Sequence, residues 1–186
     1  MISKQKIYLL GLVTLLVFPI PTFVYRIFWL HESVADILEL NSLVSRRTLN
    51  GLAFGIMYAL LSVYLLKKPI FKNELSKQQT ILSHLNLNAF DAIFLSLCAG
   101  IGEELLFRAG LQLVLNPILV TIIFIAIHGY YNPRNWRLSL YGLLLTPFIL
   151  VISYGFEYYG LWFAIAAHFA YDWVLFNDSR LKTTTE

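Results

Sequence analysis

Long apolar runs recur along this chain of 186 residues, and their length constrains its fold more than any other feature. A helix of about 20 apolar residues crosses the hydrocarbon core of a bilayer. The sequence is 58% hydrophobic and only 13% charged, whereas soluble domains carry about 25% charged residues. Because backbone polar groups in lipid must bond within their own segment, such runs form helices. The sequence therefore predicts an all-α integral membrane protein, folded as a single domain over residues 1–186.

Six of these runs are candidate transmembrane helices, which predicts a polytopic bundle of about six spans. They cover residues 7–30, 51–66, 89–115, 117–131, 138–154 and 157–176. Pro19 and Pro21 are expected to kink the first span. Between the first two spans, residues 31–50 mix apolar and charged side chains, as in a short amphipathic helix that lies at the membrane interface.

Basic residues are concentrated on one side of this predicted topology. With six spans both termini lie on the same side, and 10 of the 14 basic residues lie there with them. They are Lys4, Lys6, Lys67, Lys68, Lys72, Lys77, Arg134, Arg137, Arg180 and Lys182. Because cytoplasmic segments are enriched in lysine and arginine, both termini are predicted to be cytoplasmic. In a prokaryote the membrane would be the inner membrane.

Composition also narrows the possible partners. The formal net charge of +3 comes from dispersed basic residues that flank apolar runs, so no nucleic-acid partner is expected. The single cysteine, Cys98, cannot form an internal disulfide or a cysteine-based metal cluster. Membrane lipid is the expected partner, and no cofactor is expected.

Three of the predicted spans contain ionisable residues that lipid disfavours. They are Glu103, Glu104 and Arg108 in the third span, His128 in the fourth, and His168 and Asp172 in the sixth. A charged side chain at the centre of a membrane helix costs about 2.5–3.5 kcal/mol on insertion scales. Residues four apart share a helix face, so Glu104 can pair with Arg108, and His168 with Asp172. Glu103 points in a different direction, toward a cavity that the two histidines are expected to share.

These residues form three motifs, each on its own predicted helix. The motifs are Glu103-Glu104-x-x-x-Arg108, Phe124-x-x-x-His128 and His168-x-x-x-Asp172, in this order. With them the chain resembles the CAAX prenyl protease and bacteriocin-processing (CPBP, or Abi) family of intramembrane glutamate proteases. The resemblance covers residues 89–176, which would form the catalytic core, while residues 1–88 would supply additional spans and a basic loop. It implies a peptidase whose substrate is a peptide or a lipidated protein at the membrane.

The resemblance also implies roles for four residues in hydrolysis. Glu103 would be the general base that activates water, and His128 would help to bind and orient that water. His168 and Asp172 would stabilise the oxyanion of the tetrahedral intermediate. Phe124, by contrast, is expected to be a core packing residue.

By the same resemblance, Glu104 and Arg108 would brace the site.

Two positions depart from the family's usual pattern. The third motif often ends in asparagine, and an ionised Asp172 cannot donate a hydrogen bond as an amide can. Asp172 is therefore expected to keep His168 protonated, so that the imidazolium donates. Ala109 stands where glycine is common, but both residues are small.

Two other functions fit the same residues. Glutamates, histidines and an aspartate could hold a metal ion, which would make the chain a metal-dependent membrane hydrolase, although the His-Glu-x-x-His signature is absent. The cluster could also be a structural network in a non-catalytic membrane protein, such as a bacteriocin immunity factor. Among protease substrates, prenylated C termini, bacteriocin leaders and C-terminal sorting signals all remain open.

Overall fold

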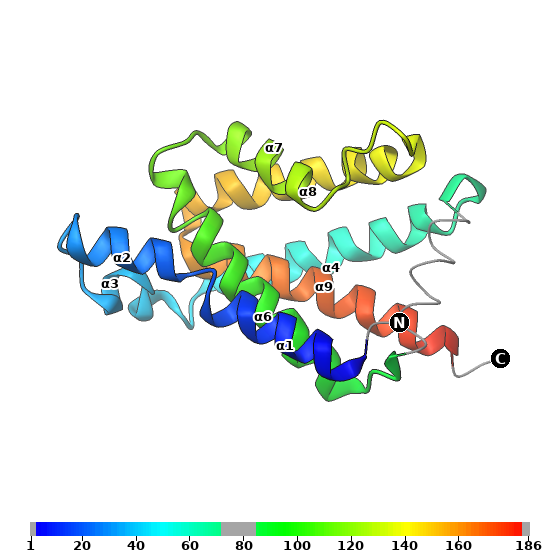
Figure 1. The fold of residues 1–186 in the computed structure, drawn as a ribbon, viewed down its shortest axis with the longest axis horizontal. Helices are drawn as coiled ribbons and strands as arrows, with labels where there is room; N and C mark the ends of the chain where they lie inside the picture. The colour runs from blue at the N-terminus through cyan, green and yellow to red at the C-terminus, as the bar shows by residue number, and fades with distance from the viewer. Residues whose placement is uncertain (1–2, 72–84, 184–186) are drawn as a thin grey trace.

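The computed structural model describes residues 3–71 and 85–183, with side chains through residue 178. Within these residues every regular element is a helix (Figure 1). The α-helices are α1 (Lys4–Leu16), α2 (Ile20–Phe28), α3 (Val34–Ile37), α4 (Arg46–Leu66), α6 (Ala89–Phe107), α7 (Pro117–Ile127), α8 (Trp136–Tyr159) and α9 (Leu161–Thr183), and the 3-10 helices are η1 (Leu40–Ser42), η2 (Pro69–Phe71) and η3 (Leu111–Leu113). The predicted all-α fold is confirmed. The basic loop predicted before residue 89 lies largely outside the described residues.

Capping residues in the sequence set where most of these helices begin. A serine or asparagine precedes each of α1, α4, α6, α7 and α8, and its side-chain oxygen accepts a hydrogen bond from a backbone N–H of the first turn. The caps are Ser3, Ser45, Asn88, Asn116 and Asn135. Pro117 occupies the first turn of α7, where its missing N–H leaves no helical hydrogen bond unmade.

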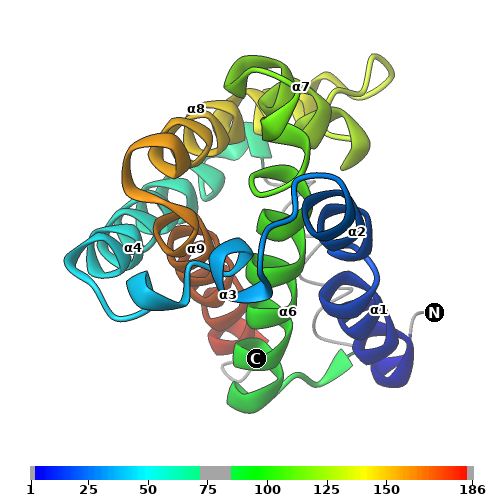
Figure 2. The ribbon, with the colours of Figure 1, turned by 90° about the vertical axis from the view of Figure 1, so that its left-hand side faces the viewer.

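Helix α9 runs through the bundle and packs against α4, α6 and α8 (Figures 1 and 2). A glycine allows α4 to approach α9 closely, because a Cβ at Gly55 would overlap the carbonyl oxygen of Ala167. A Cβ at Gly102 would likewise overlap the carbonyl oxygen of Thr14, so α1 packs tightly against α6 just before the two glutamates. Small residues at helix interfaces are the usual means of close packing in membranes.

Three helical stretches in the described part of the chain are long and apolar enough to cross a membrane. They are Lys4–Phe28, α4 and α8. Helix α7 is apolar but has only 11 residues, which corresponds to about 16 Å of helix. The start of α1 and the end of α9 lie toward the same end of the bundle (Figure 1). The six-span topology and the cytoplasmic termini remain predictions.

The segment before α4 contains short helices, as predicted. The first span is interrupted at Pro19, as expected, which separates α1 from α2. Within residues 31–50, the predicted short helix corresponds to α3, and η1 follows it before α4 begins; its place at the membrane interface remains a prediction. Positive φ angles at His31 (57°) and Glu39 (45°) interrupt the helical path. Glu39 instead binds the start of α9, where its carboxylate accepts a hydrogen bond from the N–H of Leu161 (2.8 Å).

The predicted third span, residues 89–115, ends earlier than expected. Helix α6 stops at Phe107, with Arg108 as its C-cap. The hydroxyl of Thr22 in α2 donates to the carbonyl oxygen of Leu105 (2.9 Å), which would accept a backbone N–H if the helix continued. The two glutamates therefore lie in the last two turns of α6 rather than in the middle of a long span.

Candidate active site

Three helices bring the polar residues of the three motifs together. Glu103 and Glu104 lie near the end of α6, His128 is the C-cap of α7, and His168 and Asp172 lie one turn apart on α9. Glu104 and His168 are 64 residues apart in the chain, yet Glu104 Oε1 lies 2.7 Å from His168 Nδ1. The convergence of the three helices that the sequence predicts is therefore present in the structure.

Glu104 and Arg108 form the ion pair that their spacing predicts, and both are fully buried. Arg108 Nε lies 3.0 Å from Glu104 Oε2, and both side chains are 0% exposed. The guanidinium carbon lies 5.3 Å from the ring centre of Phe124, within the range of cation–π attraction. Arg108 Nη1 and Nη2 have no hydrogen-bond partner among the described residues. Glu104 is thus the main compensation for a charge that is costly to bury.

His168 lies between two carboxylates. Because a carboxylate only accepts, the 2.7 Å contact with Glu104 requires that His168 Nδ1 carry the hydrogen. The other ring nitrogen, Nε2, lies 3.5 Å from Asp172 Oδ2, as the spacing of four predicts. Glu104 therefore fixes the tautomer and the orientation of His168 in addition to pairing with Arg108. The sequence did not indicate this contact.

His128 is oriented by its own helix. Its Nδ1 lies 2.7 Å from the carbonyl oxygen of Phe124, which only accepts, so Nδ1 donates. The Phe124 ring also stacks on the imidazole, with ring centres 4.4 Å apart, so this core residue positions His128 as well. His128 Nε2 faces Glu103 Oε2 at 3.5 Å, which is longer than the usual N–H···O distance of about 2.7–3.2 Å. Glu103 Oε2 has no hydrogen-bond partner among the described residues.

Exposure separates the site into a buried support and an accessible group. The support is the Glu104–Arg108 pair, which has no exposed surface. The accessible group consists of Glu103, His128 and Asp172, whose side chains are 13%, 29% and 24% exposed. The side chains of the second group thus have some exposed surface, although Glu103 Oε2 itself is buried, and those of the first have none. The roles that the sequence suggested for the two adjacent glutamates remain predictions.

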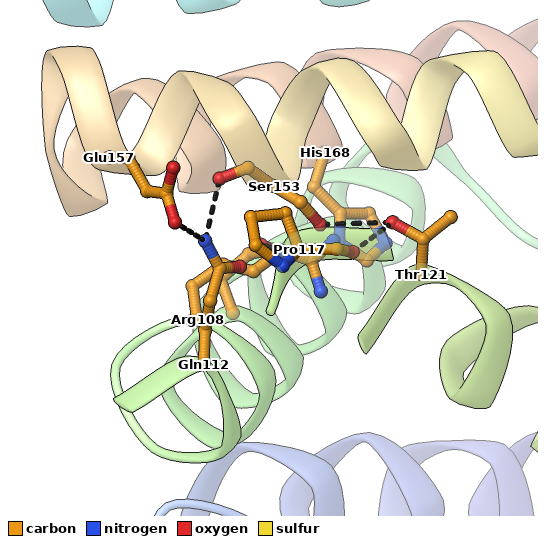
Figure 3. A network of polar contacts seen from close by, with 8 residues as sticks. Arg108, Gln112, Pro117, Thr121, Ser153, Glu157 and His168 are labelled. Carbon is orange, nitrogen blue, oxygen red and sulfur yellow. Dashed lines mark hydrogen bonds and ion pairs between the residues drawn. The ribbon is translucent and has the colours of Figure 1, made fainter. Parts of the chain in front are cut away.

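A polar network that the sequence did not indicate lies beside Arg108 and ties the segment after α6 to α8 (Figure 3). Gln112 Nε2 donates to the backbone oxygen of Ser153 (2.8 Å) and to the carboxylate of Glu157 (3.3 Å). The hydroxyls of Thr121 and Ser153 lie 3.2 Å apart, which connects α7 to the same point. The only indication of this network in the sequence is Gln112, a polar residue one turn after Arg108 in an apolar stretch.

Each imidazole of the site faces one or two carboxylates, and Asp172 is the second neighbour of His168. Glu103 faces His128, and Glu104 contacts His168. Within the ranges that the structure describes, no three His, Cys, Asp or Glu side chains are grouped so as to hold a metal ion.

Residues 85–174 match the family model described as type II CAAX prenyl endopeptidase Rce1-like. The matched range contains all three motifs and most of α6–α9. No curated protein and no solved structure matches the chain. Together, the family match and the apolar helices identify an integral membrane protein.

Proposed function

Through residues 85–174 this chain belongs to the Rce1-like family of type II CAAX prenyl endopeptidases, and we propose that it is an intramembrane endopeptidase in which Glu103 activates water. One observation carries the proposal: the Glu103 side chain, which is partly exposed, places its buried Oε2 opposite the partly exposed imidazole of His128, where three helices meet. A general base must lie within reach of the proton that it takes, directly or through one water. Glu103 offers an acceptor oxygen that no other described group occupies.

Glu103 and His128 are suited to hold one water molecule between them. Because His128 Nδ1–H is donated to Phe124, the neutral imidazole presents the lone pair of Nε2. A water that donates one hydrogen to Nε2 and one to Glu103 Oε2 directs an oxygen lone pair toward a substrate carbonyl. As the water oxygen bonds to the carbonyl carbon, Glu103 accepts one proton from it.

Negative charge then develops on the former carbonyl oxygen, and His168 is the proposed donor to it. Two carboxylates flank its ring, Glu104 at 2.7 Å and Asp172 at 3.5 Å, and they balance the charge of an imidazolium. Nδ1–H stays on Glu104 while Nε2–H is free to donate to the oxyanion. Fixed donors in a site of low dielectric constant stabilise a developing oxyanion strongly. When the intermediate collapses, the C–N bond breaks and Glu103 returns its proton to the departing amine.

The proposed substrate is a lipidated or membrane-anchored peptide or protein. Many large apolar side chains are exposed over the outer faces of the helices, including Leu9, Leu16, Met57 and Leu143, so lipid surrounds the bundle that carries the site. A scissile bond attached to a lipid or to an apolar segment would be held at the membrane near Glu103. The family's description points first to a prenylated C-terminal motif.

Cleavage assays with purified protein in phospholipid nanodiscs test the proposal. The peptides are a farnesylated peptide ending in Cys-aliphatic-aliphatic-X, a bacteriocin leader and a C-terminal sorting signal, with products identified by mass spectrometry. At least one peptide should be cleaved, and Glu103→Gln should abolish that cleavage. Glu157→Gln makes the same change at an exposed carboxylate of α8 and should retain it. Failure to cleave any of the three peptides, or full activity in folded Glu103→Gln, would overturn the proposal.

A further inference from the structure

The proposed oxyanion site has a histidine donor beside a residue that is unsuited to donate. Asp172 follows His168 by one turn, and its ionised carboxylate only accepts hydrogen bonds. Tyrosines lie near this part of the site: Tyr171 directly precedes Asp172 on α9, and Tyr130, whose ring stacks on that of His128, packs edge-on against Tyr141. A tyrosine phenol keeps its proton at neutral pH and can donate it in a hydrogen bond. These phenols are therefore candidate neutral donors beside the third motif.

Burial distinguishes the three tyrosines. Tyr141 is 6% exposed and Tyr171 is 4% exposed, and both belong to the main core of the bundle. Tyr130 is only partly buried and lies in the connection between α7 and α8. Its ring lies parallel to that of His128, with centres 5.9 Å apart and planes at 6°, and it packs edge-on against Tyr141 at 5.0 Å. Tyr130 is thus the tyrosine of this group that a substrate could reach.

Tyr130 also lies beside the proposed base, because its ring stacks on that of His128, whose Nε2 faces Glu103 at 3.5 Å. The ring of Phe124 contacts both His128 and His168, which places the third motif on the same side of the site. Its hydroxyl makes no hydrogen bond to a residue that the structure describes. The adjacent Tyr131, by contrast, has its hydroxyl 3.1 Å from that of Thr146. We propose that the Tyr130 hydroxyl is a second donor to the oxyanion, which acts together with His168 and supplies the hydrogen bond that Asp172 cannot. This inference rests on the proposed function.

Tyr130→Phe removes this hydroxyl and keeps the ring that stacks on His128. With the peptide that the wild-type protein cleaves, kcat is expected to fall by about 10²-fold, with little change in KM because the donor acts on the transition state. Tyr131→Phe is the matched control, since it removes the neighbouring hydroxyl and should leave kcat unchanged. Thermal unfolding of both variants checks that the fold is intact.

A double-mutant cycle separates a donor from a residue that only supports the site. Asp172→Asn introduces an amide that can donate at the same point. In that background the loss caused by Tyr130→Phe should shrink to less than about tenfold, because the amide replaces the missing donor. If Asp172→Asn does not fold, the comparison of Tyr130→Phe with Tyr131→Phe decides alone.

Three results would overturn the inference. They are full activity in Tyr130→Phe, an equal loss in Tyr131→Phe, and the same loss from Tyr130→Phe in both backgrounds. Full activity in Tyr130→Phe alongside an inactive Glu103→Gln would refute the tyrosine donor and leave the glutamate mechanism standing. Full activity in Glu103→Gln would instead refute the mechanism on which the inference rests.

Discussion

Removal of the Glu104 carboxylate should leave Arg108 charged and unpaired in the centre of the bundle. Glu104→Leu replaces a side chain whose Oε2 lies 3.0 Å from Arg108 Nε. Arg108 has 0% exposure, and its Nη1 and Nη2 have no other partner among the described residues. Removal of one partner from a buried ion pair costs about 3–5 kcal/mol. For a chain of this size, that corresponds to a fall in Tm of about 6–20 °C.

A second substitution separates the effect on stability from the effect on activity. Glu104→Leu with Arg108→Met removes both charges, and replacing a buried ion pair by apolar residues is often neutral for stability. Tm should therefore return most of the way to the wild-type value. Cleavage should not return, because His168 has lost the acceptor that lies 2.7 Å from its Nδ1. Tryptophan fluorescence during heating and peptide cleavage rates measure the two quantities.

Each half of this reasoning can fail separately. A wild-type Tm in Glu104→Leu would show that Arg108 does not depend on Glu104 for its burial. A double variant as unstable as the single one would place the cost in packing rather than in an unpaired charge. A double variant that cleaves substrate at the wild-type rate would refute the positioning of His168 by Glu104.

Three further predictions concern His128, the packing of the helices and metal ions. His128→Ala should lower kcat by about 10²-fold or more with little loss of Tm, since this side chain is 29% exposed; a normal kcat would exclude His128 from water activation. Gly55→Leu should lower Tm, because the new leucine side chain would collide with the carbonyl of Ala167 at a cost of about 1–3 kcal/mol or more. Ala53→Leu, the control on the exposed side of α4, should leave Tm unchanged. Incubation with a chelator should leave the cleavage rate unchanged, because the proposed mechanism activates water with the Glu103 carboxylate as the only base, and a rate restored only by added metal would contradict this.

The features predicted correctly from the sequence are those that depend on neighbours along the chain. Apolar runs identified the helices, and Pro117 occupies the first turn of α7, as its position after Asn116 predicts. The Glu104–Arg108 pair follows from a spacing of four residues on one helix. In each case the partners are separated by a turn or less, so the helical period alone brings them together.

The features that were missed depend on how distant segments dock. The contact of Glu104 with His168 joins residues 64 apart and requires the observed packing of α6 against α9. The early end of α6 coincides with a contact from α2, in which the hydroxyl of Thr22 donates to the carbonyl oxygen of Leu105. Helical periodicity predicts neither this contact nor the end of α6. Tyr130 likewise gave no signal, because it lies in a connection where no period fixes the direction of a side chain.

Single-turnover hydrolysis in H2¹⁸O tests most directly whether Glu103 activates water or attacks the substrate itself. The enzyme is held in excess over the cleaved peptide, and mass spectrometry then examines both the product and the protein fragment that contains Glu103. The account predicts one ¹⁸O in the new carboxylate of the product and none in Glu103. Label in the Glu103 carboxyl group would mean that this residue had formed an acyl bond with the substrate, which would contradict its role as a general base.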